Sequence, residues 1–139
     1  MLLETINEIP DGMYEDDALL NSFVIPDSVI RIGHRAFSGC HNLKKIVLPE
    51  SLCQIGWYAF SDCSSLECVM IPNHVNCLET GTFSGCVNLE KIGLNKVTKF
   101  GDLVFADCYK LKTVLLSKDN LSTLEMIKKT YPNICVVLV

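Results

Sequence analysis

Apolar residues recur along this chain at a fixed interval rather than in one block. Phenylalanine stands at positions 37, 60, 83 and 105, and each is followed three residues later by cysteine and six residues later by leucine. Self-similarity at a period of about 20–50 residues is typical of stacked repeats, because one repeat cannot bury its apolar face alone. We therefore predict a repeat solenoid, and function must be sought on its surface.

The clearest repeats are residues 25–47 (IPDSVIRIGHRAFSGCHNLKKIV) and 48–70 (LPESLCQIGWYAFSDCSSLECVM), which align without a gap. A third follows over 71–93. A fourth, over 94–115, has lost one residue between Leu94 and Val97. The same frame reaches back to Ile6, Ile9, Tyr14, Leu20 and Phe23.

These repeats predict about six coils of about 23 residues in a single domain over 1–139. The expected parts are an atypical N-terminal coil (1–24), four repeats (25–115) and a C-terminal capping coil (116–139). In the last coil, LSTLEMIKKTY has apolar residues at helical spacing and predicts a helix, followed by a strand. Val137 and Val139 are expected to take the places of Val114 and Leu116.

Each coil carries one alternating segment, such as Leu43 to Leu48, which predicts a strand with Ile46 and Leu48 turned inward. Proline follows the strand at positions 26, 49 and 72, where its missing N–H would interrupt a hydrogen-bond ladder. Ile-Gly pairs such as Ile55-Gly56 predict a second, shorter apolar stretch and a tight turn. Like residues of successive coils would then lie about 4.8 Å apart.

The repeated pattern, Ile-Pro-x-Ser-Val-x-x-Ile-Gly-x-x-Ala-Phe-x-x-Cys-x-x-Leu-x-x-Ile, resembles the BspA-like leucine-rich repeats. The resemblance covers nearly the whole chain. It implies a leucine-rich-repeat solenoid with a curved parallel sheet and irregular or short helical convex segments. It also implies an interaction module, often found on the surface of host-associated bacteria and some protists.

Net charge and hydropathy indicate which kinds of partner and which cell compartment to expect. The chain has 139 residues, 49% of them hydrophobic, and a net charge of −4. A nucleic-acid partner is not expected, because such proteins cluster lysine and arginine against phosphate. No apolar run approaches the roughly 20 residues of a membrane span, and MLLETINEIPDG lacks the basic start of a secretory signal. These features predict a cytoplasmic protein, whereas the family resemblance favours the cell surface.

The eight cysteines do not predict a disulfide framework. Cys40, Cys63, Cys86 and Cys108 occupy the same position of four coils, so we expect a buried column of free thiols rather than disulfide or metal ligands. A structural zinc ion remains the alternative for Cys40, His41, Cys63 and Cys68, although no two close ligand pairs are present.

No catalytic site is predicted. His34, His41 and His74 fall in variable positions without repeated acidic or serine partners, so we expect solvent-facing side chains rather than a catalytic dyad. The chain has no glycine-rich phosphate loop, no G-x-S-x-G and no H-E-x-x-H motif. We therefore expect no enzyme, no cofactor and no metal.

The outward positions of the main strands are the candidate binding site for a protein partner. One column of the predicted sheet contains Val24, Val47, Met70, Gly93, Leu115 and Leu138. The other contains Ser22, Lys45, Cys68, Lys91, Thr113 and Val136. Five of the six residues in the first column are apolar, and exposed apolar patches tend to be contact sites. The alternative explanation is the general preference of aliphatic residues for strands.

Self-association is a second hypothesis. The segment Ile134 to Val139 predicts an apolar strand at the sheet edge, which is a template for pairing with another chain. The N-terminal end of the array is acidic, with seven acidic residues among residues 1–30, whereas lysines gather near the C-terminal end. Coil ends of opposite charge would favour a homo-oligomer, while two separately solvated faces are the simpler explanation.

Overall fold

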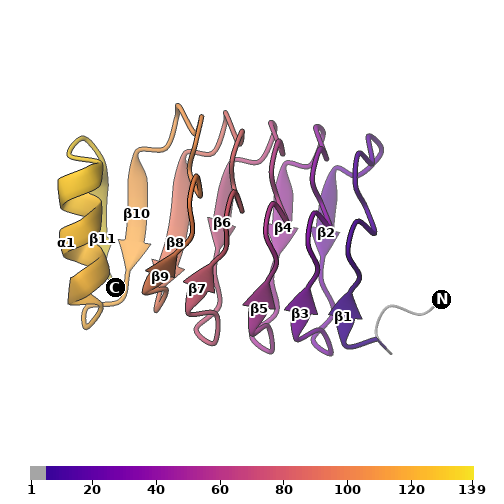
Figure 1. Cartoon of the computed structure of the whole chain (residues 1–139), viewed down its shortest axis with the longest axis horizontal. Coiled ribbons are helices and arrows are strands. Elements are labelled where there is room, and N and C mark those ends of the chain that lie inside the picture. The colour runs from indigo at the N-terminus through magenta and orange to yellow at the C-terminus, as the bar shows by residue number, and fades with distance from the viewer. Residues whose placement is uncertain (1–5) are drawn as a thin grey trace.

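The computed structural model describes residues 6–139, so the first five residues of the predicted N-terminal coil lie outside the described residues. The chain winds through stacked coils along one long axis, with the N-terminal coil at one end and a single helix at the other (Figure 1). Each coil covers the apolar side of its neighbour, which confirms the predicted solenoid.

One side of the solenoid is a six-stranded parallel sheet with one strand from each coil. Its order is β11-β10-β8-β6-β4-β2. Partners are offset by one repeat, as in Phe23 opposite Ile46 and Val69 opposite Ile92. The strands are β2 (Ser22–Val24), β4 (Lys45–Val47), β6 (Cys68–Met70), β8 (Lys91–Asn95), β10 (Thr113–Leu116) and β11 (Cys135–Leu138).

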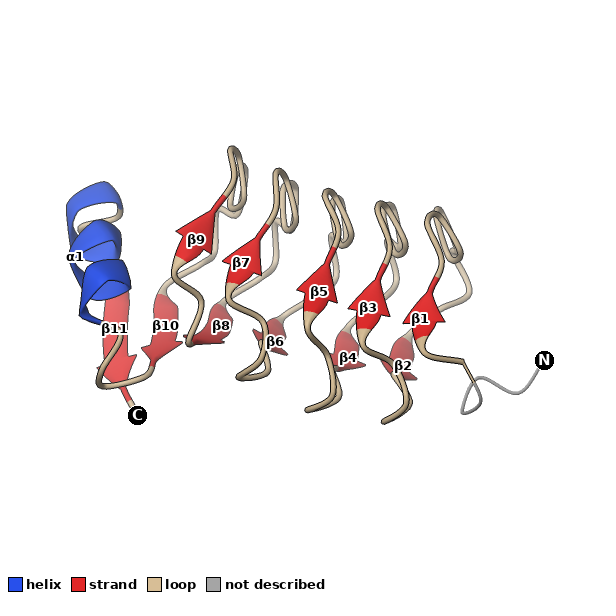
Figure 2. Cartoon of the chain, turned by 60° about the horizontal axis from the view of Figure 1, so that its bottom comes forward, coloured by secondary structure: helices blue, strands red, loops and turns tan. Residues whose placement is uncertain are grey.

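The opposite side carries shorter strands separated by turns (Figure 2). They form a three-stranded sheet (β1-β3-β5) and a two-stranded sheet (β7-β9). A Cβ atom added at Gly56 would lie 2.6 Å from the backbone nitrogen of His34, so glycine is needed for adjacent coils to approach. These strands are β1 (Glu8–Ile9), β3 (Arg31–Ile32), β5 (Gln54–Ile55), β7 (Cys77–Leu78) and β9 (Lys99–Phe100).

The convex segments are irregular rather than helical. Over residues 6–139 the one helix is α1 (Leu121–Thr130), which lies in the predicted capping coil and buries Thr123 and Ile127. Elsewhere the chain uses turns with left-handed residues, such as Gly39 and Gly85, where a helix would require uniformly negative φ. Of the two forms predicted for the convex segments, irregular or short helical, the described repeats show the irregular one.

A column of aromatic rings runs through the core along the solenoid axis. We call Tyr14, Phe37, Phe60, Phe83 and Phe105 the ring column. The centroids of Phe37 and Phe60 are 5.3 Å apart and their planes differ by 8°, and Phe60 and Phe83 repeat this arrangement at 5.5 Å and 6°. Tyr14 stacks on Phe37 at 5.3 Å, which confirms that the repeat frame extends into the first coil.

The predicted cysteine column is also present. Cys40, Cys63 and Cys86 are fully buried and Cys108 is half-buried, and all eight cysteines are free thiols. Each thiol of the column donates to a carbonyl oxygen of the preceding coil; Sγ of Cys63, for example, lies 3.1 Å from O of Phe37. Burial is the main cause that raises the pKa of Cys40 to about 11 and that of Cys108 to about 12.

The predicted register of the last strand is wrong by one residue. Val114 pairs with Val136 and Leu115 with Val137, so Val137 does not take the place of Val114. The offset between β10 and β11 is therefore 22 residues instead of 23, the same offset that separates Thr113 from Lys91. The helix sets where the chain re-enters the sheet, and repeat spacing alone does not give that position.

Candidate binding face

The outward side of the six-stranded sheet, which we call the strand face, presents two columns of side chains. In β4 the middle residue Ile46 is buried and its neighbours Lys45 and Val47 are exposed, as strand alternation requires. β6 repeats this with Val69 buried and Met70 exposed. The stacked coils thereby bring together predicted site residues that lie far apart in the sequence.

Large apolar side chains are open to solvent in one of these columns. Val24 is 71% exposed, Met70 45% and Val47 41%. Isolated exposed apolar residues are ordinary, but here they lie on consecutive strands of one sheet. The apolar column, as the register defines it, is Val24, Val47, Met70, Leu115 and Val137.

Gly93 does not interrupt this apolar column. A Cβ atom added there would lie 2.5 Å from Cε of Met70, which shows that the Met70 side chain already lies over the glycine. Beyond it, Leu115 is half-buried and Val137 is 40% exposed. The corrected register places Val137 in this column instead of the predicted Leu138.

The second column is polar and includes two lysines. Cys68 pairs with Lys45 on one side and Lys91 on the other, so a half-buried thiol lies between two exposed ammonium side chains. Thr113 follows on β10, and Cys135 replaces the predicted Val136 as the last member of the column. The strand face therefore has an apolar column beside a column of net positive charge.

A hollow of about 590 Å³ opens on this face. Four predicted site residues line it: Lys45, Val47, Cys68 and Met70. Strand alternation did not identify the other lining residues, because most of them precede or follow the strands and Asn95 is the last residue of the longer strand β8. They include Lys44, Glu50, Glu67, Pro72 and Asn95. Asn95 is held in place by its Nδ2, which donates to O of Ile71 at 2.7 Å.

None of the three histidines lines this hollow, although Nδ1 of His74 lies 3.2 Å from O of the lining residue Glu50. His34 is half-buried and stacks on Trp57 with ring centroids 3.3 Å apart, and its Nδ1 accepts a hydrogen bond from the Trp57 backbone N–H at 3.0 Å. His41 and His74 are exposed as predicted, and His34 is partly exposed because one side of its ring is covered by Trp57. Across residues 6–139, no group of three or more histidine, cysteine or acidic side chains is placed to hold a metal ion.

The fold and its columns define a leucine-rich-repeat solenoid. The family model described as the BspA type leucine rich repeat region matches residues 7–129 in six copies, and the chain belongs to this family. Five of the six strands that form the strand face therefore lie within the matched residues, and β11 lies beyond them.

Solved structures of bacterial proteins share this architecture. A T. pallidum leucine-rich repeat protein is 33% identical over 80% of this chain, with a TM-score of 0.76, and this chain spans 52% of its length. The pneumococcal vaccine antigen PcpA is 15% identical, with a TM-score of 0.76. The match covers 98% of this chain and 40% of the PcpA chain, and at this identity it shows the fold alone.

A leucine-rich cell surface protein from Faecalibacterium prausnitzii is 25% identical, with a TM-score of 0.50. The match covers 80% of this chain and 43% of that protein's chain. No significant match was found among curated proteins. Within residues 6–139, no helix is both long and apolar enough to span a membrane.

Proposed function

We propose that this chain is a non-catalytic module that binds a protein partner on the strand face. The observation that carries the proposal is the apolar column, in which Val24, Val47 and Met70 are exposed on neighbouring strands. Large apolar side chains gathered on one rigid surface tend to mark contact sites. The repeat family commonly supplies protein-interaction or surface antigen modules, which supports the same conclusion.

The lysines beside the apolar column favour a particular kind of partner. Lys45 and Lys91 are exposed at the rim of the column. Rim charges contribute mainly to association rate and selectivity, while apolar contacts at the centre supply most of the affinity. The expected partner is a protein with an apolar ridge flanked by acidic side chains.

Replacing the centre of the column tests this proposal. We expect the double variant Val47→Ser with Met70→Ser to reduce partner capture at least about tenfold, because central apolar contacts carry most interface energy. A matched control is Leu19→Ser with Ile30→Ser, which removes exposed aliphatic side chains outside the strand face. Capture that survives the first variant, with circular dichroism unchanged, would refute the assignment.

Self-association through β11 is a second candidate. β11 lies at the end of the six-stranded sheet, and Val137, Leu138 and Val139 are each at least 40% exposed. An apolar edge strand is a template for pairing with another chain. Light scattering at increasing concentration tests this candidate, which predicts a dimer in the original chain and a monomer in the Leu138→Lys variant.

Charge pairing between coil ends receives less support. Part of the acidic end is already neutralised within the chain, because Arg31 contacts Glu8 at 3.3 Å and Asp11 at 3.2 Å, and Arg35 contacts Glu15 at 2.6 Å. A homo-oligomer would therefore rely on the apolar edge of β11 more than on its charges.

The third candidate is a role in cell-surface adhesion. The F. prausnitzii neighbour is described as a cell surface protein, which favours this setting for the strand face. The sequence-based expectation of a cytoplasmic protein stays a prediction. Cell fractionation tests the location. Added protease should cleave the protein on intact cells if it lies at the cell surface, but not if it lies in the cytoplasm.

A further inference from the structure

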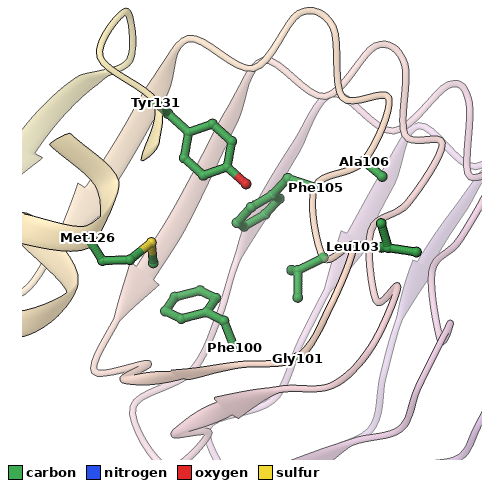
Figure 3. A pocket seen from close by; sticks show the side chains of 8 residues that line it. Phe100, Gly101, Leu103, Phe105, Ala106, Met126 and Tyr131 are labelled. Atoms are coloured by element: carbon green, nitrogen blue, oxygen red, sulfur yellow. The ribbon is translucent and has the colours of Figure 1, made fainter. Parts of the chain in front are cut away.

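A second hollow, of about 400 Å³, lies between the fifth coil and α1. We call it the cap hollow. Its lining includes Phe100 of β9, a strand on the side of the solenoid opposite the strand face (Figure 2). Phe100, Leu103 and Phe105 border it from the coil, while Met126 and Tyr131 border it from the helix and the residue that follows (Figure 3). No polar side chain other than the Tyr131 hydroxyl is among its lining residues.

The cap hollow opens where the ring column ends. Successive rings stack 5.3 to 5.5 Å apart in the central coils, and Phe83 and Phe105 are 6.2 Å apart. The next segment is a helix, which packs about 8–10 Å from its neighbours and cannot continue a column at strand spacing. The place that a further stacked ring would occupy is left partly unfilled.

Tyr131 covers Phe105 without stacking on it. Their ring centroids are 6.3 Å apart and their planes differ by 81°, an edge-to-face contact. Phe105 remains 8% exposed, whereas Phe37, Phe60 and Phe83 are fully buried. Phe105 is therefore less completely buried than the other three phenylalanines, and it borders the cap hollow.

The remaining walls suit an aromatic ligand with one polar group. The thioether of Met126 faces the space, and sulfur makes favourable contacts with ring edges. The Tyr131 hydroxyl points toward Phe105. Burial is the main cause that raises the pKa of Tyr131, and the neighbouring Cys108 adds a smaller effect. The hydroxyl therefore keeps its proton and can donate a hydrogen bond to an acceptor on a ligand.

We propose that the cap hollow binds a small planar aromatic molecule, with its ring against Phe105 and a hydrogen-bond acceptor at the Tyr131 hydroxyl. Its volume lies within the range of about 300–1,000 Å³ that small-molecule sites occupy. The ligand would extend the ring column by one member. This site is separate from the strand face, and neither proposal depends on the other.

Methyl NMR of the whole chain tests the proposal with phenol as the probe. The chain has four methionines, and a Met126→Leu variant identifies the Met126 signal. We expect phenol to shift the Met126 methyl through its ring current, saturably, with a dissociation constant of about 1 mM, as befits so small a ligand. Met13 and Met70 lie elsewhere on the solenoid, and their methyl signals should stay unchanged.

Cyclohexanol is the matched control probe, because it has the hydroxyl and similar size of phenol without the planar ring. We expect it to bind at least about fivefold more weakly than phenol, since aromatic stacking adds to area burial. Equal binding of the two probes would overturn the assignment to aromatic ligands. So would an unmoved Met126 signal at about 10 mM phenol, or a larger shift at Met70.

A Tyr131→Phe variant tests the hydrogen bond. We expect phenol to bind about three- to tenfold more weakly to this variant, as loss of a hydrogen bond predicts, whereas toluene binding should be unchanged. An equal loss for both probes would contradict the role of the hydroxyl. A blocked Gly-Phe-Gly peptide that binds more tightly than phenol would instead assign the hollow to a protein side chain and overturn the small-molecule proposal.

Discussion

The central coils and the C-terminal coils of this solenoid are built from related repeats but pack differently. Between β2 and β8, partner residues are offset by 23 positions, and the Phe37, Phe60 and Phe83 rings stack nearly parallel and fully buried. From β8 onward the offset is 22, the ring spacing widens to 6.2 Å and α1 replaces a turn.

One missing residue accounts for much of this difference. β8 is five residues long, and its pairing with β10 changes register between Leu115 and Leu116, where Leu116 faces Asn95. The irregularity keeps Leu94, Val114 and Leu116 buried despite the shorter repeat. The solenoid thus tolerates a deletion by adjusting one strand, and the looser packing appears in the ring column and at the cap hollow.

The largest expected difference in stability between the central and C-terminal coils lies in the ring column. We expect Phe60→Ala to lower the free energy of unfolding by about 3–5 kcal/mol, because it removes a ring stacked on both sides. Phe105→Ala should cost about 2 kcal/mol, since the Phe105 ring already borders a hollow. Urea denaturation followed by circular dichroism measures both losses. Equal losses would show that the two regions pack equally well.

Polar contacts give a second test at the C-terminal end. Nδ2 of the buried Asn120 donates to O of Asn95 at 3.1 Å and to O of Val97 at 2.7 Å. We expect Asn120→Ala to lower the free energy of unfolding by about 1–3 kcal/mol, because two hydrogen bonds are lost, each worth about 0.5–1.5 kcal/mol. The two carbonyls keep other donors, since Thr123 Oγ1 still donates to O of Val97 at 2.8 Å and the Ser117 backbone N–H to O of Asn95 at 3.2 Å.

Asn42 is the matched control for Asn120. Its Nδ2 donates to O of Ala18 at 2.7 Å, but the site is exposed and water can replace the amide. We expect Asn42→Ala to cost no more than about 1 kcal/mol by the same urea measurement. A larger cost at Asn42 than at Asn120 would contradict the importance of burial at the helix start.

The cysteine column predicts a loss of stability at alkaline pH. The folded state raises the pKa of Cys40 from 9.0 to about 11 and that of Cys108 to about 12, so it disfavours both thiolates. This contribution to stability is fully present below pH 9 and falls as pH rises from about 9 toward 11, because only the unfolded chain ionises freely there.

A Cys108→Ala variant isolates this effect from other titrating groups. We expect its free energy of unfolding to fall less steeply between about pH 9 and pH 11 than that of the original chain, although it is less stable at both. Parallel slopes in urea denaturation would show that the thiols do not contribute to the pH dependence.

The repeat frame was predictable from sequence because stacked coils force like residues into like environments. That rule correctly placed Phe37, Cys40 and Ile46, and it placed Val47 and Met70 together on the strand face. It failed for Val136 and Leu138, because the helix between β10 and β11 changes the offset. It also missed Glu50, which lies in a turn, and Asn95, the last residue of β8, because their orientation depends on backbone geometry beyond strand alternation.

The smallest expected effect concerns the ion pairs of the N-terminal coil. Nη2 of Arg35 lies 2.6 Å from Oε1 of Glu15, and both side chains are partly exposed. We expect Glu15→Gln to lower the free energy of unfolding by less than about 1 kcal/mol, and by still less at high salt, because exposed ion pairs are weak and screened. A loss comparable to that of Asn120→Ala in low-salt urea denaturation would show that this pair organises the first coil.

The most direct test of the proposed function is site-specific photo-crosslinking along the apolar column. A photoreactive residue is placed in turn at Val47, at Met70 and at the control position Leu19, which is 89% exposed but lies outside the column. We expect the same partner protein to be crosslinked from both column positions and not from Leu19. Crosslinking of that partner from Leu19 with equal yield, or from neither column position, would contradict it.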